Sequence, residues 1–119
     1  ATIRSIGFAG VDPTIMGAGP VPASQKALQK AGLQAQDVDF WEINEAFSAV
    51  ALAAQHALAI PNDRLNICGG AVALGHPIGC TGARILVTLV HALRRTGGRR
   101  GVAALCIGGG EAVAVAVER

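Results

Sequence analysis

Short apolar runs alternate with amphipathic segments along the chain, and this pattern predicts an α/β fold. Residues 2–10 alternate loosely between apolar and polar positions, as a strand does. Four more apolar runs predict strands, and three segments with helical periodicity separate the first four of these five strands. The predicted strands are 2–10, 38–43, 65–70, 101–109 and 112–118, and the predicted helices are 24–31, 45–58 and 81–95. This βαβαβαββ order implies a five-stranded mixed sheet, mostly parallel, with helices on both faces and an antiparallel last pair.

Proline, glycine and asparagine mark the ends of several elements. Residues 11–22 hold three prolines and two glycines and predict a loop. Gly32 stands where it would close the first helix, and Asn44 stands where it would cap the second. We expect all of these elements to form one domain over residues 1–119.

The last predicted helix is apolar around most of its circumference. Eight of its eleven positions from Ala83 to Leu93 are apolar. Such a helix belongs in an interior, but its own sheet covers only one side. We therefore expect a second domain or subunit on the other side. The alternative is a helix covered by loops, although few residues remain to supply them.

Composition and charge exclude some classes of protein. The net charge of +2 is too small to argue for nucleic acid or a membrane surface as a partner. No apolar run approaches the roughly 20 residues needed to span a bilayer. We expect no secretory signal, because the first residues, ATIRSIG, lack a basic start and a long apolar stretch. The three cysteines, Cys68, Cys80 and Cys106, are an odd number, which argues against a disulfide framework. We therefore expect a reducing compartment, the cytoplasm.

One basic cluster, "RRTGGRR", spans Arg94 to Arg100. Arginines at the end of a helix favour its dipole, and Gly97 with Gly98 would make the following turn. A phosphate-binding role is the alternative interpretation, but we expect the structural one.

Three polar residues stand in comparable places relative to the predicted strands. Asn44 and His76 each follow a strand and precede a helix, and Cys106 lies near the end of a strand. Ligands of open α/β sheets bind at the carboxyl ends of the strands, so all three side chains are expected to face one crevice.

Each of these residues also has a purely structural explanation. Asn44 alone is typical of a helix cap, His76 of a hydrogen-bonded loop histidine, and Cys106 of a small buried side chain. Against these readings, imidazole exchanges protons near neutral pH, and the N–H groups of the glycines after Cys106 could stabilise an oxyanion. Cys68 and Cys80 lack such neighbours and are interpreted as packing residues. The cysteines and His76 lack the paired spacing of a zinc site, and no metal is expected. The segment "GHPIGCTG" has no phosphate-loop pattern.

Three long motifs carry a family resemblance. The segments "NEAF" (Asn44 to Phe47), "GGAVALGHPIGCTGARI" (Gly69 to Ile85) and "CIGGG" (Cys106 to Gly110) resemble the C-terminal signatures of the thiolases, the acetyl-CoA acetyltransferases and 3-ketoacyl-CoA thiolases. The segment from Asp12 to Ala23 is similar to the start of the thiolase C-terminal half. The motifs keep the family order and cover essentially the whole chain.

The resemblance implies a fold and an activity. Thiolases consist of two similar βαβαβαββ halves in five layers, with the third helix of each half between the sheets. They make or break a carbon–carbon bond of a 3-ketoacyl-CoA, such as acetoacetyl-CoA, in a reversible Claisen condensation. Coenzyme A thioesters are then substrates, and no cofactor is implied. The partners implied are the N-terminal thiolase half and a second copy, in a homodimer or homotetramer of the complete protein.

The same resemblance implies roles for particular residues. Cys106 would be the acid and base that moves the α-proton of acetyl-CoA. His76 would activate the nucleophile and donate to the thioester oxygen of the enolate, and Asn44 would hold a water in that oxyanion hole. The N–H of Gly108 would serve a second oxyanion hole. Met16 and Phe47 resemble residues that line the pantetheine and acyl pocket.

One element of thiolase chemistry is missing from this sequence. The acyl-accepting cysteine belongs to the N-terminal half, and none of the three cysteines here lies in a similar motif. We expect that half to lie outside this chain, which alone would be inactive. Two alternatives stay open: a non-catalytic thiolase-like module that binds acyl-CoA or a partner, and a decarboxylating or condensing relative on the same fold. The relatives typically place His or Asn where Cys106 stands.

Overall fold

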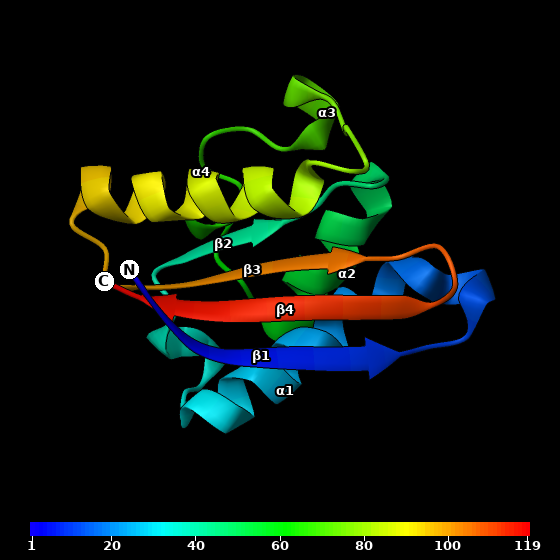
Figure 1. The fold of residues 1–119 in the computed structure, drawn as a ribbon, viewed down its shortest axis with the longest axis horizontal. Coiled ribbons are helices and arrows are strands. Elements are labelled where there is room, and N and C mark those ends of the chain that lie inside the picture. Colours follow the sequence, from blue (N-terminus) through cyan, green and yellow to red (C-terminus); the bar gives the residue numbers. More distant parts are fainter.

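The computed structural model describes residues 1–119, and its sheet has four strands. They are β1 (Thr2–Gly10), β2 (Phe40–Ile43), β3 (Arg100–Cys106) and β4 (Glu111–Glu118), in the spatial order β1-β4-β3-β2. Only β2 and β3 pair in parallel, whereas β4 pairs antiparallel with both β3 and β1 (Figure 1). The antiparallel last pair is confirmed. The mostly parallel sheet is wrong, because β4 returns beside β3 and separates it from β1.

The fifth predicted strand, 65–70, does not form. Only Leu65 bridges to Trp41, and the next residue, Asn66, has a φ of 48°, which a strand cannot continue through. The Asn66 side chain takes the place of strand pairing. Its Oδ1 accepts from the Ile43 N–H and its Nδ2 donates to the Ile43 carbonyl, both at 2.9 Å. One amide group thus satisfies the backbone that another strand would have paired.

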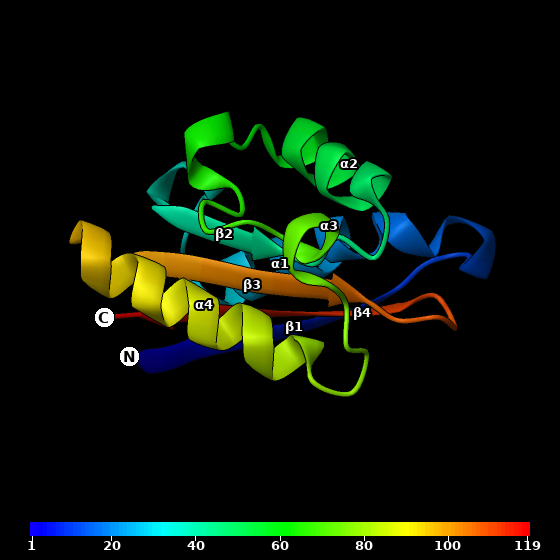
Figure 2. The same cartoon turned by 90° about the horizontal axis from the view of Figure 1, so that it is seen from above.

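Helices cover both faces of the sheet, as expected (Figures 1 and 2). Helices α1 (Pro20–Ala31) and α2 (Ser48–Leu58) lie on one face, and α4 (Thr81–Thr96) lies on the other. Helix α1 begins four residues earlier than predicted because a proline is favourable in the first turn. It ends at Gly32, whose φ of 69° gives the left-handed C-terminal cap. The short segments are α3 (Ala71–Leu74) and the 3₁₀ helices η1 (Pro13–Ala18), η2 (Ala35–Asp37) and η3 (Asn62–Arg64).

Asn44 does not cap α2, contrary to the expectation from the sequence. The helix begins at Ser48, and the extended residue before it is Phe47. Asn44 instead follows β2 directly, is 1% exposed, and its backbone N–H donates to Ala104 of β3. The chain needs residues 44–47 to leave the sheet before the helix starts.

The core divides into two unequal clusters. Sixteen buried residues form the cluster between the sheet and helices α1 and α2, with Trp41, Ile43 and Val102 among them. Five form the cluster beneath α4: Ile85, Leu89, Leu93, Ala103 and Val117. The closed face of the sheet is therefore the one under α1 and α2.

The opposite face leaves apolar side chains uncovered. Val87 of α4 is 57% exposed and Phe8 of β1 is 65% exposed. Ile6 of β1 is also exposed, and Val113 and Val115, opposite these β1 residues in the register, are half-buried. We call this surface the open face. The incomplete cover of α4 that its sequence predicts is confirmed, since no loop covers Val87.

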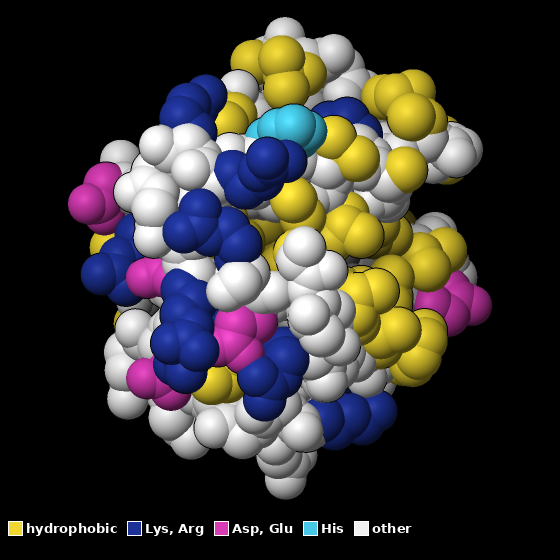
Figure 3. All heavy atoms as spheres, turned by 60° about the vertical axis from the view of Figure 1, so that its left-hand side comes forward, with side chains coloured by type: hydrophobic (Ala, Val, Ile, Leu, Met, Phe, Trp, Pro, Cys, Tyr) yellow, Lys and Arg dark blue, Asp and Glu magenta, His cyan; other side chains and the backbone are white.

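The arginine cluster lies at the end of the sheet that also holds both termini. Helix α4 ends with Arg94 and Arg95 in its last turn and Gly97 at a φ of 79°, as predicted for a structural role. Glu118 pairs with Arg4, Arg99 and Arg100. Figure 3 shows Lys and Arg side chains gathered on one side of the molecule, with acidic side chains among them and hydrophobic side chains beside them. None of the helices is long and apolar enough to cross a membrane.

Candidate active site

The chemistry-bearing residues gather at the opposite end of the sheet from the termini. The C-terminal ends of β2 and β3 and the first turn of α4 meet there (Figures 1 and 2). They enclose a cavity of about 480 Å³ with a mainly apolar lining. Its lining residues are Met16, Ala46, His76, Ile78, Thr81, Gly82, Leu105, Cys106, Ile107 and Gly108. A crevice is present at the strand ends, as expected, and His76 and Cys106 line it, but Asn44 is buried and does not.

Asn44 and His76 come together although 32 residues separate them. The Asn44 Nδ2 lies 3.4 Å from His76 Nε2. The other amide atom of Asn44, Oδ1, is buried and has no hydrogen-bond partner. A buried amide oxygen without a partner is costly, so it marks a place where a ligand or water atom would be favourable.

The second ring nitrogen of His76 contacts Thr81. His76 Nδ1 lies 2.7 Å from Thr81 Oγ1, and that hydroxyl donates to the Pro77 carbonyl at 3.0 Å. Thr81 is only 2% exposed. Thr81 could not be recognised as a site residue from the sequence, because a threonine in the first turn of a helix carries no signal of its own.

Glu45 fixes the segment that leads to His76. Its carboxylate accepts from the Val72 N–H of α3 at 2.8 Å and from Asn66 Nδ2 at 3.3 Å. A Cβ at Gly70 would collide with this carboxylate, which explains the need for glycine there. The glutamate of the "NEAF" segment thus holds α3, and Gly75, with a φ of 92°, turns the chain toward His76.

Cys106 ends β3 and is 8% exposed. Burial raises the pKa of its thiol, so the thiol is protonated at neutral pH. Beyond it, no backbone carbonyl accepts a hydrogen bond from the Gly108 N–H, which is exposed at the cavity rim. A free backbone donor and a protonated thiol therefore line the same cavity as His76.

The two expected pocket residues do not both reach this cavity. Met16 lines it, whereas Phe47 is 67% exposed and lines an adjoining apolar hollow of about 360 Å³. Met16 lies between the two spaces and lines both. The hollow therefore extends the cavity along η1 and α2.

A buried ion pair lies behind the site. Glu42 of β2, two residues before Asn44, is 1% exposed, and its Oε2 accepts from Arg84 Nη1 at 3.2 Å. Burial raises the pKa of Glu42 to about 7, against the opposing effect of the Arg84 charge. Glu42 Oε1 and Arg84 Nε and Nη2 have no partner. The pair is thus incompletely satisfied.

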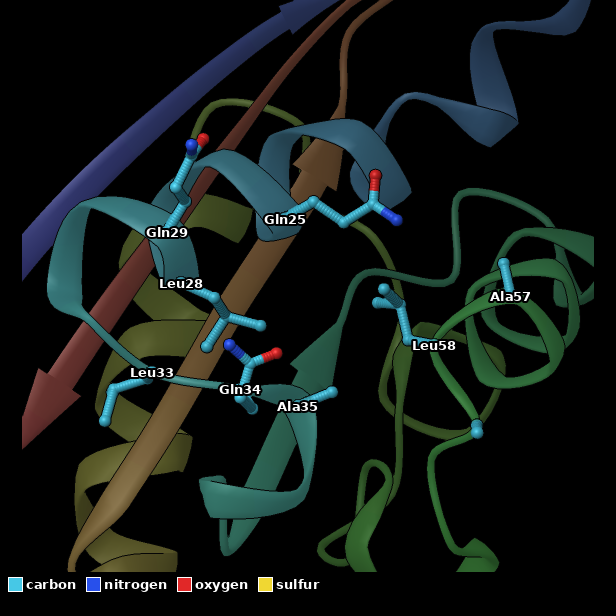
Figure 4. Close-up of a pocket in the computed structure, with 9 residues that line it drawn as sticks. Gln25, Leu28, Gln29, Leu33, Gln34, Ala35, Ala57 and Leu58 are labelled. Carbon is cyan, nitrogen blue, oxygen red and sulfur yellow. The ribbon is translucent and has the colours of Figure 1, made fainter.

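Another hollow lies away from this site. Figure 4 shows a hollow of about 390 Å³ between α1, η2 and the end of α2, lined by residues such as Gln25, Gln29 and Leu58. No ionisable side chain lines it. The structure gathers no group of three or more His, Cys, Asp or Glu side chains that could hold a metal ion.

These features define an α/β domain with a ligand-sized cavity at the carboxyl ends of its strands. The family model "Thiolase, C-terminal domain" matches residues 1–119, so the chain belongs to the thiolase family and corresponds to its C-terminal domain.

Individual relatives agree with this assignment. The chain is 57% identical over its whole length to the cytosolic acetyl-CoA acetyltransferase of Mus musculus, of which it covers 30%. It covers 29% of the Bacillus anthracis acetyl-CoA acetyltransferase crystal structure, with a TM-score of 0.95 over 98% of the chain at 51% identity. Human mitochondrial 3-ketoacyl-CoA thiolase, crystallised in complex with CoA, superposes with a TM-score of 0.94 at 49% identity, again over 98% of the chain and 29% of that structure. The chain thus spans about a third of the length of these relatives.

Proposed function

We propose that this chain is the C-terminal catalytic domain of a thiolase that carries out the reversible Claisen condensation and thiolysis of 3-ketoacyl-CoA with CoA. The observation that carries the proposal is that His76 and Cys106 line one cavity and that Asn44 lies within 3.4 Å of His76. The chemistry of acetyl-CoA explains why this set is useful: its α-carbon is a weak acid, so proton removal needs both a base and donors at the developing enolate oxygen.

In this proposal, Cys106 moves the α-proton. Its raised thiol pKa supports a role as the proton donor in the thiolysis direction, when the enolate of acetyl-CoA must be protonated. In the condensation direction the same sulfur, as a thiolate, takes the α-proton back. The small, mainly apolar lining favours the neutral thiol between these steps.

Asn44 and His76 together stabilise the enolate. His76 Nε2 is the ring atom nearest to Asn44, so a substrate oxygen near that atom would lie within reach of both residues. The unpartnered Asn44 Oδ1 would hold a water that completes this oxyanion hole. The free N–H of Gly108 would serve the second oxyanion hole, for the tetrahedral intermediate.

Met16 and Phe47 would contact the pantetheine and acyl parts of the substrate. Their positions along two adjoining apolar spaces support an elongated substrate that enters past η1. The complete protein would act as a homodimer or homotetramer.

The chain itself supplies only part of this machinery. The acyl-accepting cysteine would come from an N-terminal thiolase half that covers the open face. The exposed Val87 and Phe8 support such a partner, because large apolar side chains are favourable under a second domain and not in water.

The test compares the chain alone with a joined protein. The joined protein is the mouse acetyl-CoA acetyltransferase in which this chain replaces the matching C-terminal part. The reaction measured is thiolysis of acetoacetyl-CoA by free CoA. We expect no turnover by the chain alone and turnover by the joined protein. His76→Ala and Cys106→Ser should each lower the rate of the joined protein about 10²–10⁴-fold. His56→Ala, at an exposed position of α2, is the matched control and should leave the rate unchanged.

A non-catalytic module would give a different result. The joined protein would then bind acetyl-CoA but not turn over acetoacetyl-CoA, and His76→Ala would leave binding nearly unchanged. Turnover by the chain alone, lost in His76→Ala, would instead mean that one of its own three cysteines accepts the acyl group.

A further inference from the structure

The hydroxyl of Thr81 is the one side-chain group in contact with His76 Nδ1, the ring nitrogen on the far side from Asn44. Thr81 is 2% exposed, lies at the first position of α4, five residues after the histidine, and lines the same cavity. Its hydroxyl therefore cannot rotate freely in water, and its hydrogen bonds are limited to His76 Nδ1 and the Pro77 carbonyl.

With the Asn44 amide oriented as in the structure, one arrangement of protons satisfies the hydrogen bonds around His76. In the orientation of the Asn44 amide in the structure, Nδ2 donates and the neutral ring accepts at Nε2, but the distance of 3.4 Å is long, so this contact alone holds the ring only weakly. The ring proton is then on Nδ1, and Nδ1–H donates to Thr81 Oγ1. The Thr81 hydroxyl proton goes in turn to the Pro77 carbonyl, which can only accept. This single chain of hydrogen bonds satisfies all three distances.

We propose that Thr81 is a positioning residue that holds neutral His76 in the Nδ1–H tautomer, so that Nε2 faces Asn44 and the cavity without a proton. This inference rests on the proposed function. It assigns to one ring atom both roles expected of His76, which are to activate the nucleophile and to donate to the thioester oxygen of the enolate. Nε2 first takes the proton of the attacking thiol, which leaves a thiolate and an imidazolium. The same Nε2–H then donates to the oxygen that becomes negative. Without the fixed tautomer, part of the population would present Nε2–H to the thiol and could not accept its proton.

The same turn of α4 also holds the strand that leads to Asn44. Arg84 lies three residues after Thr81, on the same side of the helix, and pairs with Glu42 two residues before Asn44. The first turn of α4 therefore sets the position of His76 through Thr81 and contacts the strand of Asn44 through Arg84. This geometry explains how two residues from distant segments keep a distance of 3.4 Å.

The direct test determines the tautomer of the His76 ring in this chain by ¹H–¹⁵N long-range NMR correlations of labelled histidine. Only three histidines are present, and His76→Asn identifies the signal. Above the pH at which the ring is protonated, we expect the Nδ1–H pattern. Thr81→Val removes the hydroxyl at equal size and should shift the ring toward a mixture of tautomers, and Thr81→Ser should restore the original pattern.

Thr88→Val is the matched control. Thr88 lies two turns further along α4, and its hydroxyl donates to the carbonyl of Arg84 at 2.9 Å, as Thr81 does to Pro77. The Thr88→Val variant loses a comparable hydrogen bond at a residue that does not contact His76, so the His76 signal should not change. An Nε2–H pattern in the unmodified chain, or an unchanged pattern in Thr81→Val, would overturn the proposal.

A kinetic measurement on the joined protein covers the case in which a variant of the isolated chain does not fold. Thr81→Val should lower kcat for thiolysis about 10-fold, Thr81→Ser should recover most of it, and Thr88→Val should have little effect. The expected loss is much smaller than the roughly 10⁴-fold seen when a carboxylate partner of a catalytic histidine is replaced, because the hydroxyl carries no charge. Equal losses in Thr81→Val and Thr88→Val would overturn the positioning role. If the joined protein has no thiolysis activity but the NMR pattern behaves as expected, the proposed function fails and the role of Thr81 in holding the ring stands.

Discussion

Ala114 and Ala116 of β4 are fully buried beneath α1, whereas Val113 and Val115 of the same strand are only half-buried on the opposite face. The larger side chains thus occupy the less covered side. On the closed face, alanines and Gly7 let α1 approach the sheet closely. On the open face, α4 covers β2, β3 and Val117 of β4, but it leaves the β1 side chains exposed and Val113 and Val115 of β4 half-buried. The comparison indicates that the chain completes one core by itself and only begins a second.

The largest expected effect comes from placing a charge on each face of β4. Ala114→Asp buries a carboxylate without a partner and should cost more than about 4 kcal/mol, enough to unfold the chain. Val113→Asp, one residue earlier, should cost at most about 1 kcal/mol in the chain because water still reaches it. Urea unfolding followed by circular dichroism measures both.

The same pair of variants tests what covers the open face. In the joined protein, Val113→Asp should become several-fold more destabilising, because an N-terminal half would remove that site from water. If its cost is the same in the chain and in the joined protein, the open face is not covered by that half.

The unfolding free energy should depend on pH through Glu42, the buried carboxylate on the side of the sheet that α4 covers. Burial raises its pKa from 4.5 to about 7, so between these values the folded state holds a proton that the unfolded state releases. Its contribution to stability is therefore complete below about pH 4.5 and is lost as the pH rises through 7. At about 1.4 kcal/mol per unit of pKa shift, the loss is on the order of 3 kcal/mol.

Glu42→Gln should remove this dependence. The unfolding free energy of the unmodified chain, minus that of the variant, should fall between about pH 4.5 and pH 7. Glu111→Gln, at an exposed position of β4, is the control. A flat difference for Glu42→Gln would mean that the Arg84 charge keeps the carboxylate ionised throughout.

The smallest effect concerns the close approach of α1 to β1. A Cβ at Gly7 would collide with the backbone of Ala23 and Ala27, whereas a Cβ at Gly10 of the same strand would meet nothing within 4 Å. Gly7→Ala should therefore lower the unfolding free energy by about 2 kcal/mol. Gly10→Ala should change it by less than about 0.5 kcal/mol. Equal effects in thermal unfolding would contradict the tight packing of the closed face.

The sequence predicted most helices and strands because their periodicity reflects burial within the chain itself. The strand at 2–10 matches β1, and the helix at 81–95 matches α4 within one residue. The incomplete cover of α4 was also foreseeable, since eight apolar positions in eleven exceed what one sheet can bury.

The remaining features depend on contacts between distant residues. The strand expected at 65–70 has the right composition, but the Asn66 side chain supplies the pairing and the backbone turns away. From the sequence, we expected Asn44, His76 and Cys106 at one end of the sheet, but we also expected Asn44 to cap a helix. The position of Asn44 after a strand fits both roles. Thr81 could not be found, since its contact with His76 exists only after the intervening loop has folded.

Asn66 also has a consequence for how these molecules behave at high concentration. The outer edge of β2 would otherwise offer free backbone groups to a strand of another molecule, which is a common route to aggregation. Asn66 occupies both backbone groups of Ile43 and, through its own N–H at 2.8 Å, the Trp41 carbonyl. Replacing this side chain would leave the N–H and the carbonyl of Ile43 without these partners, whereas the Trp41 carbonyl would keep its backbone hydrogen bond.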